Sequence, residues 1–459
     1  MSTILGAMPF YFSRTLENPL DAIFESMSGF TTTGVSVFNA KAFDKNGIEI
    51  PIIVTDPYVP EKSYTYYGTI NPVRNLLTNE IIYSGTEAVS KGILFWRSFT
   101  QWLGGMGIVV LFIAILPALA IGGKFLFEAE VPGPTKDTIV PRIRETSSIL
   151  WKLYVGLTLL EVLLLIWTHP SMPLLDAFCI TFSTLSTGGF SVTNESIGSY
   201  NNPATEWVVI VFMILGSINF ALYFFILRKK FYRLKEPDLF LHLLIVFGGC
   251  LLVSCYLFGQ TNLELNGTSS PFTVSSAIRE GVFQAVSAQT CTGFSTTNYN
   301  FWPFPAQLTL LLLMYLGGMS GSTSGGVKTS RIMILYKVIS HRIENMFKPD
   351  VVRKLRIGNK EIIPSISVSV LTFFTMIVLF TILGTFLLVF CGIDPQTSIS
   401  SVASMLNNVG LGFRAAGPTS SFAFFTAGAK IVSIFLMLFG RLEFFVMLLL
   451  FIPGFWKNK

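Results

Sequence analysis

Long stretches without charged residues are the feature that most restricts how this chain can fold. The segment 363–391 runs IPSISVSVLTFFTMIVLFTILGTFLLVFC, whereas a helix that crosses a bilayer needs only about 20 predominantly apolar residues. Only 13% of the chain is charged, against about 25% in soluble domains. The sequence therefore predicts an all-α polytopic membrane protein. We expect spanning helices near 93–121, 147–168, 205–227, 239–258, 305–319, 327–341, 363–391 and 427–452.

Four polar phrases rich in Thr, Ser and Gly interrupt this apolar pattern. A segment of about 12–17 residues leads into each phrase, a length that fits a re-entrant helix better than a span. The order of long helix, short helix, phrase and long helix predicts an internal repeat, M1–P–M2, in four copies around one central pore, with the first M1 truncated. The phrases are 29–36, 183–193, 288–297 and 407–414, and the short helices are 19–30, 172–186, 274–290 and 397–408.

Loop charges give the repeats a common direction in the membrane. The segments after each M2 are basic, whereas 191–205 and 295–305 contain neither Lys nor Arg. The positive-inside rule places the basic segments in the cytoplasm and the phrases near the outer face. The basic segments are 122–146, 228–235, 342–360 and 457–459. The predicted units are 1–121 with an ordered extracellular insertion at 41–91, 147–236, 237–347 with a broken M2, and 361–459.

The phrases themselves predict a cation site. Non-helical backbone at membrane depth is costly unless it lines water or is buried in protein, and glycine permits the turns that aim successive carbonyl oxygens at one axis. A ring of carbonyls can replace the water shell of a cation, and the partly negative ends of the short helices favour the same charge. The alternative is that these glycines serve close helix packing. The candidate ring residues are Thr33, Gly34, Val35, Thr187, Gly188, Gly189, Phe190, Thr292, Gly293, Phe294, Val409, Gly410 and Leu411.

The third M2 is broken by the sequence GGMSGSTSGGVKTS at 317–330. A run this rich in Gly and Ser does not make a stable lipid-facing helix. It is either an ordinary kink or a flexible loop that obstructs the pore until it moves. In the second interpretation the glycines supply mobility: Gly317, Gly318, Gly321, Gly325 and Gly326. The hydroxyl residues supply a polar wall: Ser320, Ser322 and Thr323.

Arg441 lies inside the last apolar segment. A charge at the bilayer centre costs about 2.5–3.5 kcal/mol, so such a residue is usually functional or paired. Glu443 is two positions away and would face elsewhere on a helix. The alternative is an arginine near a helix end that snorkels to the interface. Lys328, at the end of the broken segment, is a second candidate of this kind.

Three stretches resemble the bacterial Trk-type potassium uptake subunit, of the Trk/Ktr/HKT superfamily. They are ILFWRSFTQWLGGMGIVVLFIAILP at 93–117, GGMSGSTSGGVKTSRI at 317–332 and FGRLEFFVMLLLFIPGFW at 439–456. The resemblance covers essentially the whole chain and implies a single-chain pore of four pseudo-equivalent M1–P–M2 units. It implies a gating loop at 317–326 and an Arg441 that faces the pore. It also implies a potassium-selective filter, with the ion at Thr33, Gly34, Gly189, Gly293 and Gly410.

The same resemblance implies partners and a location. It implies a homodimer in the cell inner (cytoplasmic) membrane and a cytosolic nucleotide-binding regulatory subunit (TrkA-like). We expect potassium as the transported ion, no cofactor and no nucleic-acid partner. The sequence differs from the family in two respects: it starts inside the first M1, without the family's extra N-terminal helices, and the insertion at 41–91 is longer than expected.

Two other function classes compete with this interpretation. A sodium-permeable or ion-coupled secondary cation transporter built from inverted repeats would need two halves of opposite topology, whereas the basic segments follow every M2. A membrane enzyme would need a metal-ligand cluster, a nucleophile elbow or paired carboxylates, and the apolar regions contain none of these motifs. We therefore expect a transport protein and not an enzyme. Whether transport is channel-like or coupled to protons or sodium stays open.

Overall fold

The computed structural model describes residues 2–44, 47–55, 62–75, 78, 80–110, 143–263, 269–347, 356–357, 360–362 and 364–450. Parts of several predicted features lie outside this set. They include the ends of the predicted 93–121 and 427–452 spans and parts of the predicted insertion at 41–91. They also include the basic residues Lys124, Lys136, Arg142, Lys348, Arg353, Lys354, Lys457 and Lys459.

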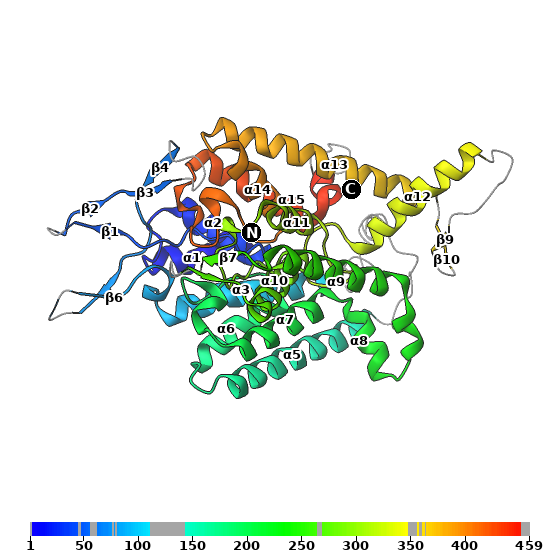
Figure 1. Ribbon diagram of the computed structural model, residues 1–459, viewed down its shortest axis with the longest axis horizontal. Coiled ribbons are helices and arrows are strands. Elements are labelled where there is room, and N and C mark those ends of the chain that lie inside the picture. The colour runs from blue at the N-terminus through cyan, green and yellow to red at the C-terminus, as the bar shows by residue number, and fades with distance from the viewer. Residues whose placement is uncertain are drawn as a thin grey trace.

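Two long helices, α5 (Ile143–Thr168) and α13 (Pro364–Phe390), run along opposite edges of the molecule in Figure 1. Among the described residues, these two and α9 (Pro237–Leu257) are long and apolar enough to cross a membrane. Their outer faces carry exposed aromatic side chains, such as Phe247 at 69% and Phe390 at 86% exposure. A soluble protein would not leave such a surface uncovered, so the prediction of a multi-pass helical membrane protein is confirmed.

The predicted span at 205–227 is not one straight helix. It consists of α7 (Pro203–Ser217) and α8 (Phe220–Leu227), which meet at an angle of 95°. The backbone of Ile218 is extended, and the side-chain oxygen of Asn219 accepts a hydrogen bond from the Ala221 amide at 2.9 Å. An Asn N-cap starts a new helix at this point, so apolar length alone mispredicted the geometry here.

Shorter helices fill the interior. All four predicted short helices are present, as α2 (Pro19–Phe30), α6 (Leu174–Leu185), α10 (Val274–Gln289) and α14 (Pro395–Leu406). The other helices are α1 (Ser2–Phe12), α3 (Lys91–Val110), α11 (Phe304–Tyr315), α12 (Thr329–Phe347) and α15 (Ala427–Leu450), with 3-10 turns η1 (Gly85–Ala88), η4 (Ser196–Tyr200), η5 (Phe231–Lys235), η6 (Tyr299–Phe301), η7 (Arg414–Ala416) and η8 (Phe422–Phe424).

The described residues of the predicted insertion at 41–91 form short antiparallel strand pairs. It contains the antiparallel pairs β1 (Ala42–Phe43) with β2 (Glu49–Ile50), β3 (Ile52–Thr55) with β4 (Ser63–Tyr66), and β5 (Val73–Arg74) with β6 (Ile81–Tyr83). These strand pairs project from one end of the molecule in Figure 1. The opposite end carries α8, the end of α12, and the pair β9 (Arg356–Ile357) with β10 (Lys360–Glu361). A last pair joins β7 (Thr261–Leu263) to β8 (Ser269–Pro271).

Candidate functional site

The four short helices end in the same way. In each, an amide two residues after the C-cap donates to the carbonyl of a serine five residues earlier, which is the 6→1 bond of a Schellman motif. These bonds run from Thr33 to Ser28 at 2.9 Å, Gly188 to Ser183 at 2.8 Å, Thr292 to Ser287 at 2.9 Å, and Val409 to Ser404 at 2.8 Å. The common ending places the predicted ring glycine at the same distance after every helix.

Each ending also contains a residue in the left-handed region that is not glycine. Thr32, Thr187, Cys291 and Asn408 have φ of 52°, 53°, 57° and 53°. This conformation costs an L-residue about 1–2 kcal/mol and is unusual for a β-branched side chain. Such strain persists only where the surrounding structure imposes it, so the backbone of all four phrases is held by more than its local sequence preference.

The four predicted ring glycines have φ of 84° at Gly34, 77° at Gly189, 89° at Gly293 and 92° at Gly410. A Cβ placed on Gly34 would lie 2.2 Å from the carbonyl oxygen of Gly188, and one on Gly189 would lie 2.1 Å from that of Thr292. In the same way, a Cβ on Gly293 would lie 2.1 Å from the carbonyl oxygen of Val409, and one on Gly410 would lie 2.5 Å from that of Thr33, which closes the cycle. The four phrases therefore encircle one axis in sequence order.

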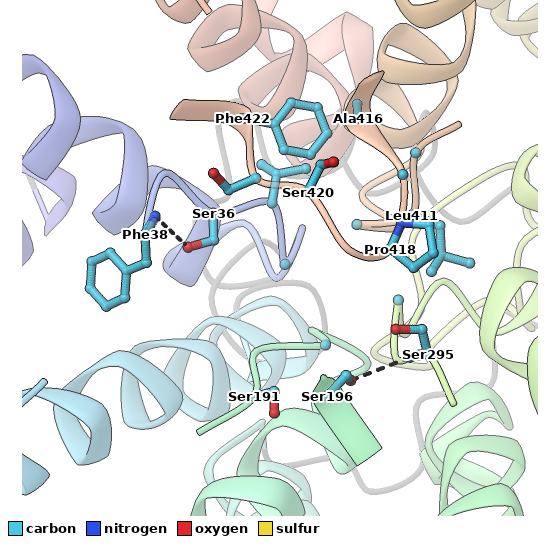
Figure 2. A pocket seen from close by; sticks show the side chains of 18 of the residues that line it. Ser36, Phe38, Ser191, Ser196, Ser295, Leu411, Ala416, Pro418, Ser420 and Phe422 are labelled. Carbon is cyan, nitrogen blue, oxygen red and sulfur yellow. Dashed lines mark hydrogen bonds between the residues drawn. The ribbon is translucent and has the colours of Figure 1, made fainter. Parts of the chain in front are cut away.

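A pocket opens onto this ring (Figure 2), and all four glycines line it. Serines that follow the ring, Ser36, Ser191 and Ser295, contribute polar side chains to its wall. The apolar residues after the glycines are buried against the protein, with Val35, Phe190, Phe294 and Leu411 at most 3% exposed. The structure thus brings the four ring glycines to the wall of one cavity, together with Val35 and Leu411. The other predicted ring residues do not line it: Thr33, Thr187, Gly188, Phe190, Thr292, Phe294 and Val409.

The loop between α11 and α12 closes the other side of the ring. Thr323 Oγ1 donates to the carbonyl of Leu185, the last residue of α6, at 2.9 Å. Ser324 Oγ donates to the C-cap carbonyl of Thr290 at 2.8 Å, and a Cβ on Gly325 would lie 2.2 Å from the carbonyl of Asn407. These partners precede the ring glycines, whereas the pocket is lined by the glycines and residues after them. The ring therefore lies between the pocket and the loop.

The loop is folded tightly rather than extended. The amide of Gly317 donates to Val327 O at 2.9 Å, and that of Val327 donates to Tyr315 O at 3.0 Å, so the loop returns to where it began. Gly321 and Gly326 have positive φ of 78° and 66°. The remaining predicted residues also lie in the loop. The Gly318 amide and the Lys328 Nζ both donate to Ser324, to its Oγ and its carbonyl oxygen respectively. Ser320 Oγ bonds with Ser330 Oγ, and Ser322 Oγ donates to the Met319 carbonyl.

Arg441 reaches the same loop from α15. Its guanidinium donates to Thr323 O at 2.8 Å and to Gly104 O at 3.1 Å. Glu443 faces a different partner, as its spacing predicts, and pairs with Arg331 at the start of α12. The backbone of Glu443 has φ of 54° and interrupts α15 at this point. The sequence pattern does not indicate Arg331 as the partner, because the two residues are far apart in sequence.

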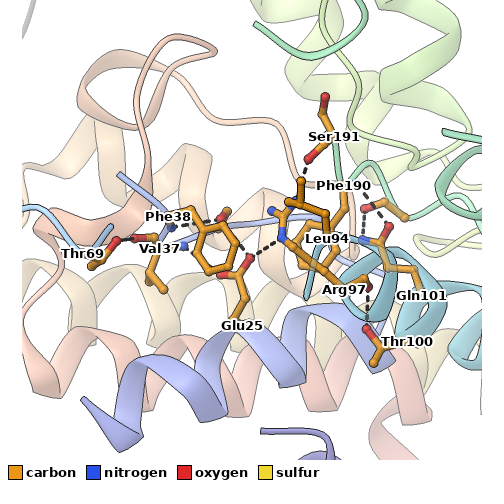
Figure 3. A network of polar contacts seen from close by, with 12 residues as sticks. Glu25, Val37, Phe38, Thr69, Leu94, Arg97, Thr100, Gln101, Phe190 and Ser191 are labelled. Atoms are coloured by element: carbon orange, nitrogen blue, oxygen red, sulfur yellow. Dashed lines mark hydrogen bonds and ion pairs between the residues drawn. The ribbon is translucent and has the colours of Figure 1, made fainter. Parts of the chain in front are cut away.

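A second buried ion pair, also not predicted from the sequence, lies beside the ring (Figure 3). Arg97 Nε lies 2.7 Å from Glu25 Oε1, and the two side chains are 4% and 0% exposed. The guanidinium carbon lies 3.6 Å from the ring centroid of Phe190. Arg97 is a charged residue within the apolar stretch 93–117, and the reasoning applied to Arg441 would have indicated that it is functional or paired.

Comparison with known proteins supplies the family. The model of the TrkH family, described as cation transport protein, matches residues 76–457. The Trk system potassium uptake protein TrkH of Salmonella typhimurium is 33% identical, covering 99% of this chain and 83% of that protein. The uptake protein TrkG of Escherichia coli is 31% identical with the same coverage. The crystal structure of the potassium transporter TrkH from Vibrio parahaemolyticus superposes with a TM-score of 0.77 at 30% identity, over 99% of this chain and 83% of that one.

Proposed function

The chain belongs to the TrkH family of cation transport proteins, and on that premise we propose that it takes up potassium through the ring formed by its four phrases. The family consists of transport proteins and not of enzymes. The observation that carries the proposal is the closed cycle of close approaches from Gly34 through Gly189 and Gly293 to Gly410. A cation on that axis would meet backbone carbonyl oxygens from every side.

The ring serves as a selectivity filter. Carbonyl oxygens replace the hydration shell of a monovalent cation, and Thr33, Gly34, Gly189, Gly293 and Gly410 supply the site for potassium. The C-terminal ends of α2, α6, α10 and α14 all precede the ring, and their partial negative charge lowers the energy of a cation there. Glycine at all four ring positions favours potassium over sodium, as the family resemblance implies.

Four M1–P–M2 repeats build this filter. Their bounds are 1–121, 147–236, 237–347 and 361–459. The support is the shared ending of the short helices, in which the same Schellman bond precedes each ring glycine. One such ending would be a local feature, whereas four at the same spacing indicate one structural unit used repeatedly.

The loop 317–326 acts as the gate. It contacts the ends of α6, α10 and α14 through Thr323, Ser324 and Gly325, and so it lies across the path of an ion that has passed the ring. Arg441 holds the loop through the Thr323 carbonyl. Opening requires these contacts to break together.

The family resemblance further supports a homodimer in the inner membrane with a cytosolic nucleotide-binding regulatory subunit. The described basic residues of 228–235 and 342–360 lie at the end of the molecule opposite the strand pairs of 41–91. The positive-inside rule places these basic residues in the cytoplasm, and the strand pairs then face outward. The described basic residues that would face the regulatory subunit are Arg228, Lys229, Lys230, Arg233, Lys235, Arg342, Arg356 and Lys360.

Uptake measurements in potassium-starved cells that lack their own potassium uptake systems test this function. The protein should restore growth at low external potassium and take up potassium faster than sodium. Equal rates for the two ions would instead support the sodium-permeable alternative, and dependence of potassium uptake on a sodium or proton gradient would support a coupled carrier. No restored uptake by protein present in the membrane would contradict the proposal.

A further inference from the structure

The four phrases differ in how their backbone is supported. Glu25 of α2 accepts hydrogen bonds from Ser36 Oγ at 2.9 Å and from the Val37 amide at 3.0 Å, just after the first ring glycine. In α10, Gln284 and Ser287 donate to the Phe294 carbonyl at 3.2 Å and 2.7 Å. Phrases one and three are therefore each held by the short helix that leads into them.

The fourth phrase follows the same rule. The amide of Gly410 donates to Ser404 Oγ at 3.0 Å, and that of Phe413 donates to Ser400 Oγ at 3.2 Å. Both serines belong to α14, which again is the helix directly before the phrase.

The second phrase lacks such support from its own helix. Glu25 and Gln284 both stand nine residues before a ring glycine, and the same position in α6 is Ile180, which cannot hydrogen-bond. The hydroxyl groups of Thr181 and Ser183 make no hydrogen bond among the described residues. No side chain of α6 in the described part of the chain bonds the backbone of 188–191, so another element must hold this phrase.

That element is α3, which carries two polar side chains one helical turn apart (Figure 3). Gln101 is fully buried; its Nε2 donates to the Gly188 carbonyl at 2.6 Å, and its Oε1 accepts from the Phe190 amide at 3.1 Å. Arg97 donates to the Ser191 carbonyl at 2.8 Å. A buried amide with both ends bonded to backbone fixes that backbone, because releasing either bond would leave a buried polar group without a partner.

Gln101 also fills space that the second phrase leaves empty. The other phrases carry Thr33, Thr292 and Val409 immediately before the ring glycine, whereas the second carries Gly188. A Cβ on Gly188 would lie 2.5 Å from Cδ, 2.7 Å from Oε1 and 2.9 Å from Nε2 of Gln101. A side chain at 188 and the observed position of the Gln101 amide therefore exclude each other.

We propose that Gln101, supported by Arg97, is a positioning residue that sets the ion selectivity of the ring, by holding the second phrase and occupying the place of the side chain that Gly188 lacks. The inference rests on the proposed function, because it treats the ring as the filter. Gln101 touches no ion and acts through the direction of the Gly188 carbonyl, which borders Gly34 in the ring.

The test measures potassium and sodium fluxes into proteoliposomes containing the purified full-length protein. Gln101→Met keeps most of the side-chain volume but removes both hydrogen bonds, and it should lower the potassium-to-sodium flux ratio about tenfold or more. Gln307→Met is the matched control: this buried amide bonds the carbonyls of Asn300 and Trp302 at 2.7 Å and 2.8 Å, outside the ring, and its loss should leave the ratio unchanged. An unchanged ratio in Gln101→Met would overturn the inference.

A double-mutant cycle tests the exclusion between positions 101 and 188. Gly188→Ala should lower the flux ratio by displacing the Gln101 amide, and it should lower it no further when Gln101→Ala is already present. Additive losses in the double variant would contradict the idea that Gln101 replaces a missing side chain.

Gly189→Ala separates failure of this inference from failure of the proposed function. A Cβ there meets the Thr292 backbone carbonyl at 2.1 Å, which no side-chain movement can relieve. If Gly189→Ala changes the ratio and Gln101→Met does not, only the role of Gln101 is overturned. If neither changes it, the ring is not the filter and both proposals fail.

Discussion

Arg441 donates a hydrogen bond of 2.8 Å to the carbonyl oxygen of Thr323, and so joins α15 to the loop below the ring. A second bond of 3.1 Å runs from the same guanidinium to Gly104 O. Gly104 itself packs against the end of α2, since a Cβ there would lie 2.2 Å from Phe30 O. One side chain therefore connects the loop and the last helix to α3, which in turn packs against the end of the first short helix. Hydrogen bonds of a charged group are worth about 1.5–3 kcal/mol each, enough to offset the cost of burying the charge.

We predict that Arg441→Met raises basal potassium flux. The substitution removes both bonds and leaves the loop held by its contacts to the short helices and to Gly216, Ser217 and Phe220 at the α7–α8 bend. The open state therefore becomes more populated, and losing about 1.4 kcal/mol of closed-state stability would raise flux roughly tenfold while the closed state predominates. Flux into proteoliposomes measures the effect. Arg228→Met, at an exposed residue near the end of α8, is the control and should behave as wild type. Unchanged flux in Arg441→Met would show that the arginine does not hold the gate.

Deleting residues 320–325 should also raise basal flux. The deletion removes Thr323 and Ser324, whose hydroxyls donate to the ends of α6 and α10. Because the acceptor of Arg441 is lost with Thr323, adding Arg441→Met should have little further effect. A correctly inserted deletion variant with wild-type flux would remove the gate interpretation.

The length of the short helices was the part of the fold that the sequence predicted best. The ranges 19–30 and 274–290 match α2 and α10 to within one residue, because a polar phrase with glycine ends each helix abruptly. The bend at Ile218 was missed although Asn219 is a good N-cap, since the apolar pattern continues on both sides of it. The length of an apolar segment indicates whether it can lie in a membrane, but it does not show where the helix bends.

Contacts between distant segments were beyond the reach of the sequence pattern. Nothing in the sequence distinguishes Gln101 from its polar neighbours Ser98 and Thr100, and its role is visible only once Gly188 is placed against it. Lys328 resembled Arg441 as an intramembrane cation, yet it donates to Ser324 within its own loop, while Arg441 crosses to another element. Spacing along one helix predicts which side chains share a face, and it does not identify the partner on another helix.

Gly34→Ser should raise sodium flux relative to potassium. Gly34 has φ of 84°, and a Cβ there would lie 2.2 Å from the Gly188 carbonyl oxygen, so the serine must displace one of the ring oxygens. A change of about 1.4 kcal/mol in the relative energies of the two ions would alter selectivity tenfold. Competition between the two ions in uptake assays measures it. Gly47→Ser offers a control, because Gly47 also has positive φ but has nothing within 4 Å of its Cβ position. Selectivity that survives Gly34→Ser would count against the assigned filter.

Replacing only Arg331 of the Arg331–Glu443 ion pair should destabilise the protein more than replacing both residues. Arg331 is 1% exposed at the start of α12 and also lies 4.0 Å from the ring centroid of Phe373. Arg331→Met leaves the Glu443 carboxylate buried without its partner, at an expected cost of about 3–5 kcal/mol. The double variant Arg331→Met with Glu443→Gln should recover part of that loss. Melting temperatures in detergent would show it, and equal melting temperatures for the single and double variants would contradict the expected coupling.

Anomalous diffraction from crystals soaked in rubidium tests the central claim most directly, because rubidium substitutes for potassium in carbonyl-lined sites and can be located by its own scattering. In the wild-type protein we predict a rubidium peak on the axis enclosed by Gly34, Gly189, Gly293 and Gly410. In crystals of the Gly34→Ser variant soaked in rubidium together with sodium, we predict a weaker peak or none at this position. Rubidium bound only elsewhere, with no density inside the ring, would contradict the account.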